Sequence, residues 1–192
     1  MMRSHLLYDN LTRFTSHEKG IAAVEFALTL PIMLFVFVGV TQVGQAVSIS
    51  HRVTITARTI TDLVTRETVS TGLVPASTIQ TDLAAAAQVI APYPSTTLTV
   101  TVSQIVTDSN GNATVNWSQS WPNNNNALVA GSAFTLPSSL AGANITIIYG
   151  QVSYGYTPIL GYKIIRPMTL SDSIYLYPRT GTCVPVVNEC PQ

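Results

Sequence analysis

The chain of 192 residues is 46% hydrophobic and only 9% charged, whereas ordinary soluble domains have roughly 25% charged residues. Nine basic and nine acidic side chains balance, so neither nucleic acid nor an acidic surface is indicated as a partner. The length allows one domain of average size and one additional element.

The additional element is an apolar segment at residues 21–40, in which Glu25 is the one ionisable side chain. About 20 residues at 1.5 Å each cross a hydrocarbon core of roughly 30 Å. A core helix of a soluble protein would normally show a polar face over such a length. We therefore expect residues 21–40 to span a membrane.

Helical spacing continues beyond this apolar run. Apolar side chains recur near the helical period from Val43 to Val64, and no proline interrupts residues 32–74. We expect one helix over residues 21 to about 68, with about 40 Å of it outside the membrane. The alternative is a cleaved secretory signal, because Gly44 and Ala46 form a small-x-small sequence. That cut would sever the helix, and the run exceeds the usual signal core of about 7–15 residues.

Four parts are expected along the chain. They are a cytoplasmic leader open to cleavage (1–20), a transmembrane helix (21–40), its extramembrane continuation (41–68) and an exported α+β domain (69–192). Three basic residues precede the span, and Arg52 and Arg58 follow it closely. The positive-inside rule therefore favours a cytoplasmic N-terminus only narrowly.

The start of the span has a distinctive local order. Residues 19–26 read K-G-I-A-A-V-E-F, so Gly20 precedes the apolar run, Glu25 is the fifth residue after it, and Phe26 follows. This order resembles a type IV prepilin processing site, and the wider run, including Pro31 of A-L-T-L-P, resembles TadE-like proteins of the tight-adherence (Flp) pilus system. The resemblance implies that a prepilin peptidase cuts after Gly20 on the cytoplasmic side and leaves Ile21 as the new N-terminus. Phe26 departs from the pattern, because Flp pilins usually have tyrosine there.

The carboxylate of Glu25 has two interpretations. It is either an interfacial group that suits the positive end of a helix, or the partner of the ammonium that cleavage would create at Ile21. Across two packed helices, the second arrangement would set the axial register of assembly. A charge at the bilayer centre costs on the order of 3 kcal/mol, so a partner makes the carboxylate tolerable.

A second helix is expected after Pro75. Ser77 and Gln80 have the spacing of a capping box, Asp82 lies in the first turn, and Pro92 ends the helix. Its apolar stripe consists of Ile79, Leu83, Ala86, Ala87 and Ile90.

A β-hairpin is expected next. Asn110 and Gly111 signal a two-residue turn with positive φ at both positions. The resulting pairs are Val106 with Val115, Gln104 with Trp117, Val102 with Gln119 and Val100 with Trp121. Trp117 and Trp121 share a face with valines, which favours core packing over a partner-binding role.

The remaining elements complete an α+β fold. Residues 122–143 are expected to form a polar surface loop, residues 145–156 a strand with a bulge at Gly150, and residues 170–177 a fourth strand. The W-S at 117–118, Y-G-Y-T-P at 154–158 and Y-P-R at 177–179 are also similar to TadE-like ectodomains. We expect a long membrane-spanning helix that extends into a pilin-like domain with a second helix and an antiparallel sheet of about four strands.

Signals for catalysis and cofactors are absent from the sequence. His5, His17 and His51 are dispersed, and there is no phosphate loop or dinucleotide fingerprint, so we expect no metal, cofactor, small-molecule substrate or enzyme activity. Sequons begin at Asn112, Asn116 and Asn144, but a chain this rich in Asn, Ser and Thr produces them by chance. Cys183 and Cys190 lie close together in a region expected to be exported, which favours a disulfide between them.

The resemblance implies a structural role. It points to a single-pass pseudopilin or assembly component of a tight-adherence pilus in the bacterial inner membrane, with the C-terminal domain in the periplasm. Expected partners are the lipid bilayer, the prepilin peptidase and other pilins or pseudopilins, and not nucleic acid. The alternatives are a type II secretion pseudopilin and a membrane-tethered binding or adhesion module, with an enzyme a distant third.

Overall fold

The computed structural model describes residues 18–67, 73–158 and 166–186 of the chain. The chain divides into two compact units, 1–44 and 45–192. Helix α2 (Glu18–Thr65) begins in the first unit and ends in the second. The expected long helix is thus present, and its last helical residue is Thr65.

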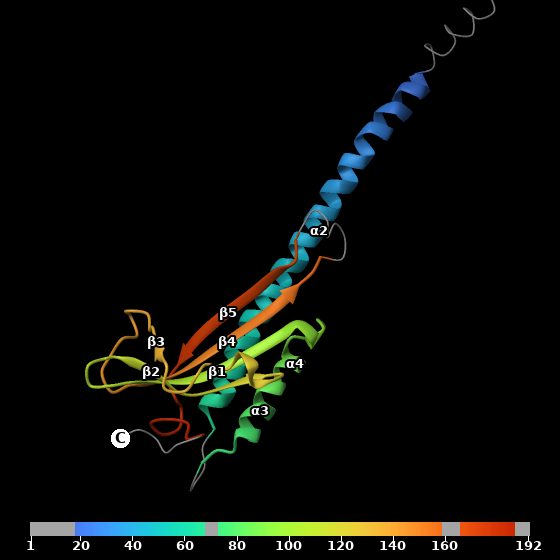
Figure 1. Ribbon diagram of the computed structural model, residues 1–192. Helices are drawn as coiled ribbons and strands as arrows, with labels where there is room; N and C mark the ends of the chain where they lie inside the picture. The colour runs from blue at the N-terminus through green and yellow to red at the C-terminus, as the bar shows by residue number, and fades with distance from the viewer. Residues whose placement is uncertain (1–17, 68–72, 159–165, 187–192) are drawn as a thin grey trace, which may run out of the picture. The chain divides into compact units, whose positions relative to one another are not determined.

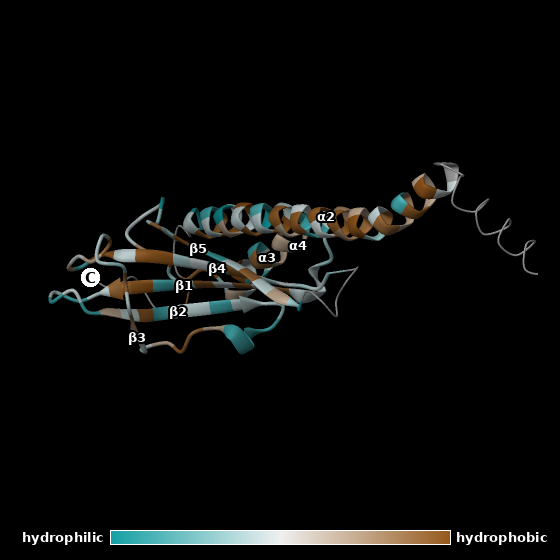
Figure 2. Ribbon diagram, turned by 90° about the horizontal axis from the view of Figure 1, so that it is seen from above, coloured by the Kyte–Doolittle hydropathy of each residue, from teal (hydrophilic) through white to brown (hydrophobic). Residues whose placement is uncertain are grey.

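The N-terminal part of α2 is exposed on all sides, from Gly20 to Phe37. Most of these residues are apolar. Pro31 lies inside the helix, and Figure 2 shows the predominantly hydrophobic colouring of this part. Proline has no N–H to donate, so the helix passes Pro31 without one of its backbone hydrogen bonds.

In the second unit, one antiparallel sheet of five strands follows the helices, in the order β3-β2-β1-β4-β5 (Figure 1). The α+β fold is therefore confirmed, with five strands in place of about four because a two-residue strand joins the edge beside β2. The helical elements after α2 are α3 (Ala76–Ala84), α4 (Ala86–Val89), η1 (Ser95–Thr97) and η2 (Asn124–Asn126). The strands are β1 (Leu98–Thr107), β2 (Ala113–Trp121), β3 (Ala133–Phe134), β4 (Thr146–Tyr156) and β5 (Met168–Leu176).

The main core lies between the sheet and the helices, which occupy one of its faces (Figure 2). One face of α2 supplies apolar residues at spacings of three and four, as a helix of 3.6 residues per turn requires. Each of them is at most 3% exposed: Ile49, Val53, Ala57, Ile60 and Val64. From α3 onward, Ile79, Leu83, Ala86 and Ile90 of the predicted stripe are completely buried in the same cluster, whereas Ala87 is only partly buried.

Gly150 of β4 is a point where the sheet approaches α2 closely. The expected bulge is wrong, because the pairing of β4 with β1 runs through Gly150 without a shift. A Cβ atom on Gly150 would lie 1.8 Å from Oγ1 and 2.9 Å from Cβ of Thr61. The change in hydrophobic pattern at this glycine therefore reflects a helix packed against the strand.

The β1–β2 hairpin follows the predicted register in its distal half only. Val100 pairs with Trp121, Val102 with Gln119 and Gln104 with Trp117, as expected. Nearer the turn, Ile105 pairs with Val115 and Val106 with Thr114, so the expected pair of Val106 with Val115 is wrong.

The cause is a three-residue loop. The N–H of Gly111 donates to the carbonyl of Asp108 (3.0 Å), and Gly111 has φ +83° while Asn110 does not have positive φ. This is the common loop of a type I turn followed by a left-handed residue. Asn116 then bulges out of β2 and restores the predicted register beyond it.

Helix α3 begins without the predicted capping box. Pro75 occupies the N-cap, and its side chain has no hydrogen-bonding group with which to cap the helix. The amide Nε2 of Gln80 instead donates to Oε1 of Gln119 (2.8 Å) across to β2. Gln80 was assigned to a cap by its spacing, whereas in the fold it joins α3 to the sheet.

The segment at 122–143 is exposed over much of its length, as expected of a polar loop, and it also covers part of the far face of the sheet. Phe134 pairs with Ala113 across β3 and β2, and its ring lies 5.1 Å from that of Tyr149. Around these residues a second small cluster forms, with a buried centre and a partly buried rim: Ile105, Ala113, Val115, Leu128, Phe134, Leu136 and Tyr149.

Candidate processing site, apolar helix and tyrosine-lined pocket

Gly20 and Ile21 lie in the first turn of the described helix. Gly20 is exposed, and a Cβ atom placed on it would meet no described atom within 4 Å. Glycine inside a helix costs roughly 1 kcal/mol relative to alanine. No close packing contact accounts for the glycine, so the local fold leaves its presence unexplained.

Glu25 follows Ile21 by four residues, which is a rise of about 6 Å along the helix. Its side chain is exposed, and its backbone carbonyl accepts a hydrogen bond from Oγ1 of Thr29 (3.1 Å). Among the described residues, both ion pairs involve Asp62, with Arg66 and with Arg179. The carboxylate of Glu25 therefore has no cationic partner within the described part of the chain.

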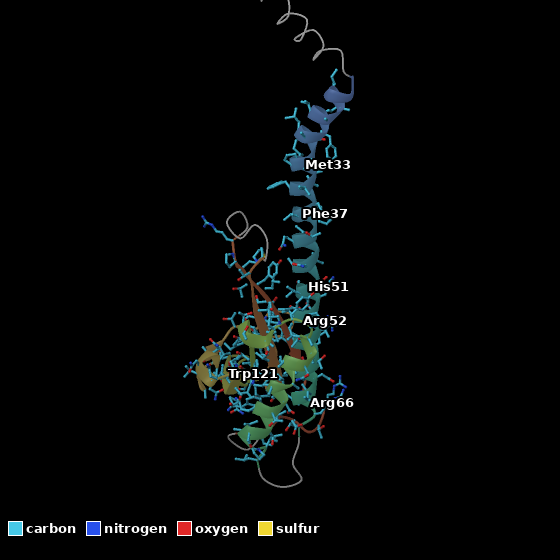
Figure 3. The ribbon with its side chains drawn as sticks, turned by 90° about the vertical axis from the view of Figure 1, so that its right-hand side faces the viewer. Met33, Phe37, His51, Arg52, Arg66 and Trp121 are labelled. Carbon is cyan, nitrogen blue, oxygen red and sulfur yellow. The ribbon has the colours of Figure 1, made fainter. Side chains whose placement is uncertain are left out.

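Large apolar side chains surround these residues. Phe26 is 61% exposed, Leu28 69% and Phe37 65%. Met33 and Phe37 project outward from the helix in Figure 3. In the described part of the chain this is the one helix long and apolar enough to cross a membrane. Exposure of so large an apolar surface marks a membrane or protein interaction site.

The structure describes one of the two cysteines. Cys183 is buried (3% exposed), and Cys190 lies outside the described residues. The neighbouring Val184 donates its N–H to Oε1 of Gln104 at 2.8 Å. The disulfide between Cys183 and Cys190 stays a prediction.

A tyrosine-lined pocket in the second unit was not anticipated from the sequence. Its volume is about 310 Å³, and Tyr93, Tyr154 and Tyr156 contribute to its wall. Burial, followed by the neighbouring Tyr93, raises the pKa of Tyr156 above its usual value. The Y-G-Y-T-P sequence at 154–158 was the available signal, but the pocket depends on Tyr93, which lies about sixty residues away in sequence.

Outside the apolar helix, Asp82 is the acidic residue whose pKa departs markedly from its usual value. Burial, followed by the negative charge of Glu67, raises its pKa from 3.8 to about 6. Its Oδ2 atom is buried and has no hydrogen-bond partner among the described residues. The sequence placed Asp82 in the first turn of a helix, and the structure places it near the end of α3 (Ala76–Ala84).

Metal-binding clusters are not found in the described ranges 18–67, 73–158 and 166–186. Within them, no group of three or more His, Cys, Asp or Glu side chains is arranged to hold a metal ion. His51 is exposed on α2 (Figure 3). Nothing in this arrangement assigns a catalytic role to a residue.

Comparison with known proteins gives one match. Residues 20–61 match the model of the family described as TadE-like protein. No curated protein and no solved structure matches the chain. The match begins at Gly20, includes Glu25, Phe26 and Pro31, and ends at Thr61, the residue that lies against Gly150.

The matched residues occupy most of helix α2, from the exposed apolar part to the part that packs on the sheet. The family is a pilus-associated structural family. Residues 20–61 are thus a TadE-like segment, and the resemblance to TadE-like proteins predicted from the sequence is confirmed.

Proposed function

We propose that this protein is a single-pass membrane pseudopilin or assembly component of a tight-adherence pilus, with a structural and not a catalytic role. One observation carries the proposal. A single TadE-like helix has an exposed apolar first part and a second part whose buried face forms the core of a folded α+β unit. The first part suits a membrane and the second anchors a domain outside it.

The proposed topology is a leader at 1–20 in the cytoplasm, a span at 21–40, and helix and domain beyond residue 40 on the periplasmic side of the inner membrane. The low charge of the chain and the predominance of Ser, Thr and Asn in its polar part support an exported surface. A long C-terminal domain can be translocated with little regard to its own charge.

The proposed processing step is cleavage after Gly20 by a prepilin peptidase. Gly20 is exposed, and no described atom lies within 4 Å of a Cβ placed on it, so we attribute its presence to recognition rather than to the fold. The new α-amino group at Ile21 would be largely protonated at neutral pH. Glu25, one helical turn away and without another partner in the described residues, would then neutralise it on its own helix or on a neighbouring one.

The test is the intact mass of the protein extracted from its native membrane. We expect a chain that begins at Ile21. A Gly20→Leu variant should remain at full length, whereas Gly39→Leu, at another helical glycine with no described atom within 4 Å of an added Cβ, should be processed normally. A chain that begins at Val47 would identify a secretory signal and would refute both the topology and the pilus role.

A membrane-tethered binding module is the second candidate, and one feature favours it. A pocket of about 240 Å³ on the far face of the sheet is lined by hydroxyl and amide side chains: Thr99, Thr101, Asn126, Gln151 and Ser153. Such groups suit a neutral polar ligand, for example a sugar. This candidate requires no cleavage after Gly20, so the same mass measurement separates it from the pseudopilin.

A further inference from the structure

The tyrosine-lined pocket lies at the end of the second unit where α2 enters it. Gln45 and Ile49 of α2 form one wall, and the segment around η1 and the end of β4 form the others. The remaining lining residues are Tyr93, Pro94, Thr96, Thr97, Tyr154, Gly155, Tyr156 and Thr157. Its volume of about 310 Å³ is at the lower end of the range for small-ligand sites.

This end of the unit is also the end closest along the chain to the proposed span. Gln45 follows Val40 by five residues of continuous helix, a rise of about 7.5 Å. The head-group region adds about 5–7 Å to each side of the hydrocarbon core. If residues 21–40 span the membrane, as proposed above, only a few residues of the chain separate the end of the span from the α2 wall of the pocket.

A basic residue lies beside the end of the sheet that lines the pocket. Arg166 is exposed two residues before Met168, which pairs with Tyr156 and is itself 41% exposed. None of the residues that line the pocket is acidic. Four described carboxylates lie at the opposite end of the unit, where α2 and β1 finish: Asp62, Glu67, Asp82 and Asp108. Asp172 lies within β5, where it pairs with Val152. An exposed cation without a neighbouring carboxylate favours an anionic ligand.

The side chains fit the chemistry of a lipid surface. Tyrosine rings combine an apolar body with a polar tip, and they are enriched where a membrane meets water. Thr96 and Thr157 are exposed beside them and can donate hydrogen bonds to phosphate or ester oxygens. We propose that this pocket binds the head-group region of a membrane phospholipid, with Arg166 directed to its phosphate, and so holds the folded unit against the membrane.

The experiment places the full chain in lipid nanodiscs that contain phospholipid with a nitroxide on the head group, which quenches nearby tryptophan fluorescence. Three variants each add one tryptophan to the native Trp117 and Trp121: Tyr93→Trp at the pocket, Tyr177→Trp, and Phe37→Trp in the span. Tyr177 is 57% exposed and follows β5 at the end opposite Met168, about 30 Å away along the strand. It is the matched control.

We expect the added emission of Tyr93→Trp to be quenched at least threefold more strongly than that of Tyr177→Trp. In anionic nanodiscs, adding Arg166→Gln to Tyr93→Trp should lower this quenching at least twofold. Adding Arg58→Gln, an exposed cation further along α2, should leave the quenching unchanged.

The Phe37→Trp variant separates the two proposals. Its quenching by nitroxide on the acyl chain reports the membrane span itself. If Phe37→Trp is quenched while Tyr93→Trp and Tyr177→Trp behave alike, the span stands and the lipid pocket is refuted; the pocket then faces solvent or a protein partner. If Phe37→Trp is not quenched, the membrane anchor fails and the pocket proposal fails with it.

Discussion

Trp117 and Val184 are joined by a hydrogen bond of 2.9 Å from the indole Nε1 to the backbone carbonyl, across 67 positions of the chain. Val184 also donates its N–H to Oε1 of Gln104 at 2.8 Å. Gln104 and Trp117 are paired across β1 and β2. This one cross-strand pair therefore binds both the N–H and the carbonyl of Val184. All three residues are at most 1% exposed, and this contact fixes the segment that carries Cys183.

Replacing Trp117 by Phe should therefore destabilise the folded unit. The change leaves the buried carbonyl of Val184 without its donor, which costs about 1–3 kcal/mol. Chemical unfolding of the full chain in detergent micelles measures the loss. Trp121→Phe, at a ring that is only partly buried, should cost clearly less. Equal losses for the two variants would contradict the role of the hydrogen bond.

Gly150→Ala should destabilise the protein more than any other glycine-to-alanine change in the second unit. The new methyl group would overlap Oγ1 of Thr61 and press on its Cβ, so helix and strand must separate. Combining it with Thr61→Ala should recover part of the loss. Gly142→Ala, where the nearest atom is a side-chain carbon at 3.4 Å, is the control. A melting temperature of Gly150→Ala equal to that of Gly142→Ala would show that α2 does not pack this closely.

The hairpin loop predicts different effects at its two central residues. Gly111 has φ +83°, which a β-branched residue tolerates badly, so Gly111→Val should cost more than about 1 kcal/mol while membrane insertion is unaffected. Asn110 has no positive φ, so Asn110→Ala should cost little. A two-residue turn with positive φ at both positions would instead make both substitutions costly. Thermal melting of the two variants distinguishes the loops.

Asp82 should make stability fall as the pH rises. The folded-state pKa of about 6 lies above the unfolded value of 3.8, so between these values the folded state binds more protons than the unfolded state. The penalty is absent below about pH 4 and complete above the folded pKa. Asp82→Asn should therefore raise the melting temperature at pH 8 and leave it nearly unchanged at pH 4.

Glu67→Gln is the companion variant for this pH effect, because the negative charge of Glu67 is the second cause of the raised pKa of Asp82. We expect a smaller gain in melting temperature at pH 8 than Asp82→Asn gives. A gain of the same size at pH 4 and pH 8 for Asp82→Asn would show that the effect is not one of protonation.

Under the proposed function, substitutions of Glu25 should leave insertion and processing intact but abolish pilus assembly. Glu25→Ala removes the partner of the Ile21 ammonium but leaves the residues before the cut unchanged, so the protein should be inserted and processed yet fail to support pilus assembly. Glu25→Gln should fail in the same way, because it keeps the size and loses the charge. Immunoblots of membrane fractions and counts of surface pili measure the two parts. Normal piliation with Glu25→Ala would show that residues 21–40 serve only as a membrane anchor.

The sequence by itself determined the features that depend on neighbours in the chain. Helical spacing placed α2 and the buried stripe of α3, and the apolar run at 21–40 identified the membrane candidate. The order of Gly20, Glu25 and Phe26 was enough to suggest the TadE-like segment, because processing motifs are local. The strand pairs far from the hairpin turn were also predicted correctly, from the alternation of apolar and polar residues and an approximate position of the turn.

Only the tertiary structure decided the features that depend on contacts between distant segments. The two-residue turn and the bulge at Gly150 were wrong because a local pattern cannot report a neighbouring helix or a compensating bulge at Asn116. Gln80 has the sequence spacing of a capping residue, but in the fold its side chain donates a hydrogen bond to Gln119 on β2. The tyrosine-lined pocket needs three segments that only folding brings together. Packing against distant elements outweighs local preference wherever the two compete for the same side chain.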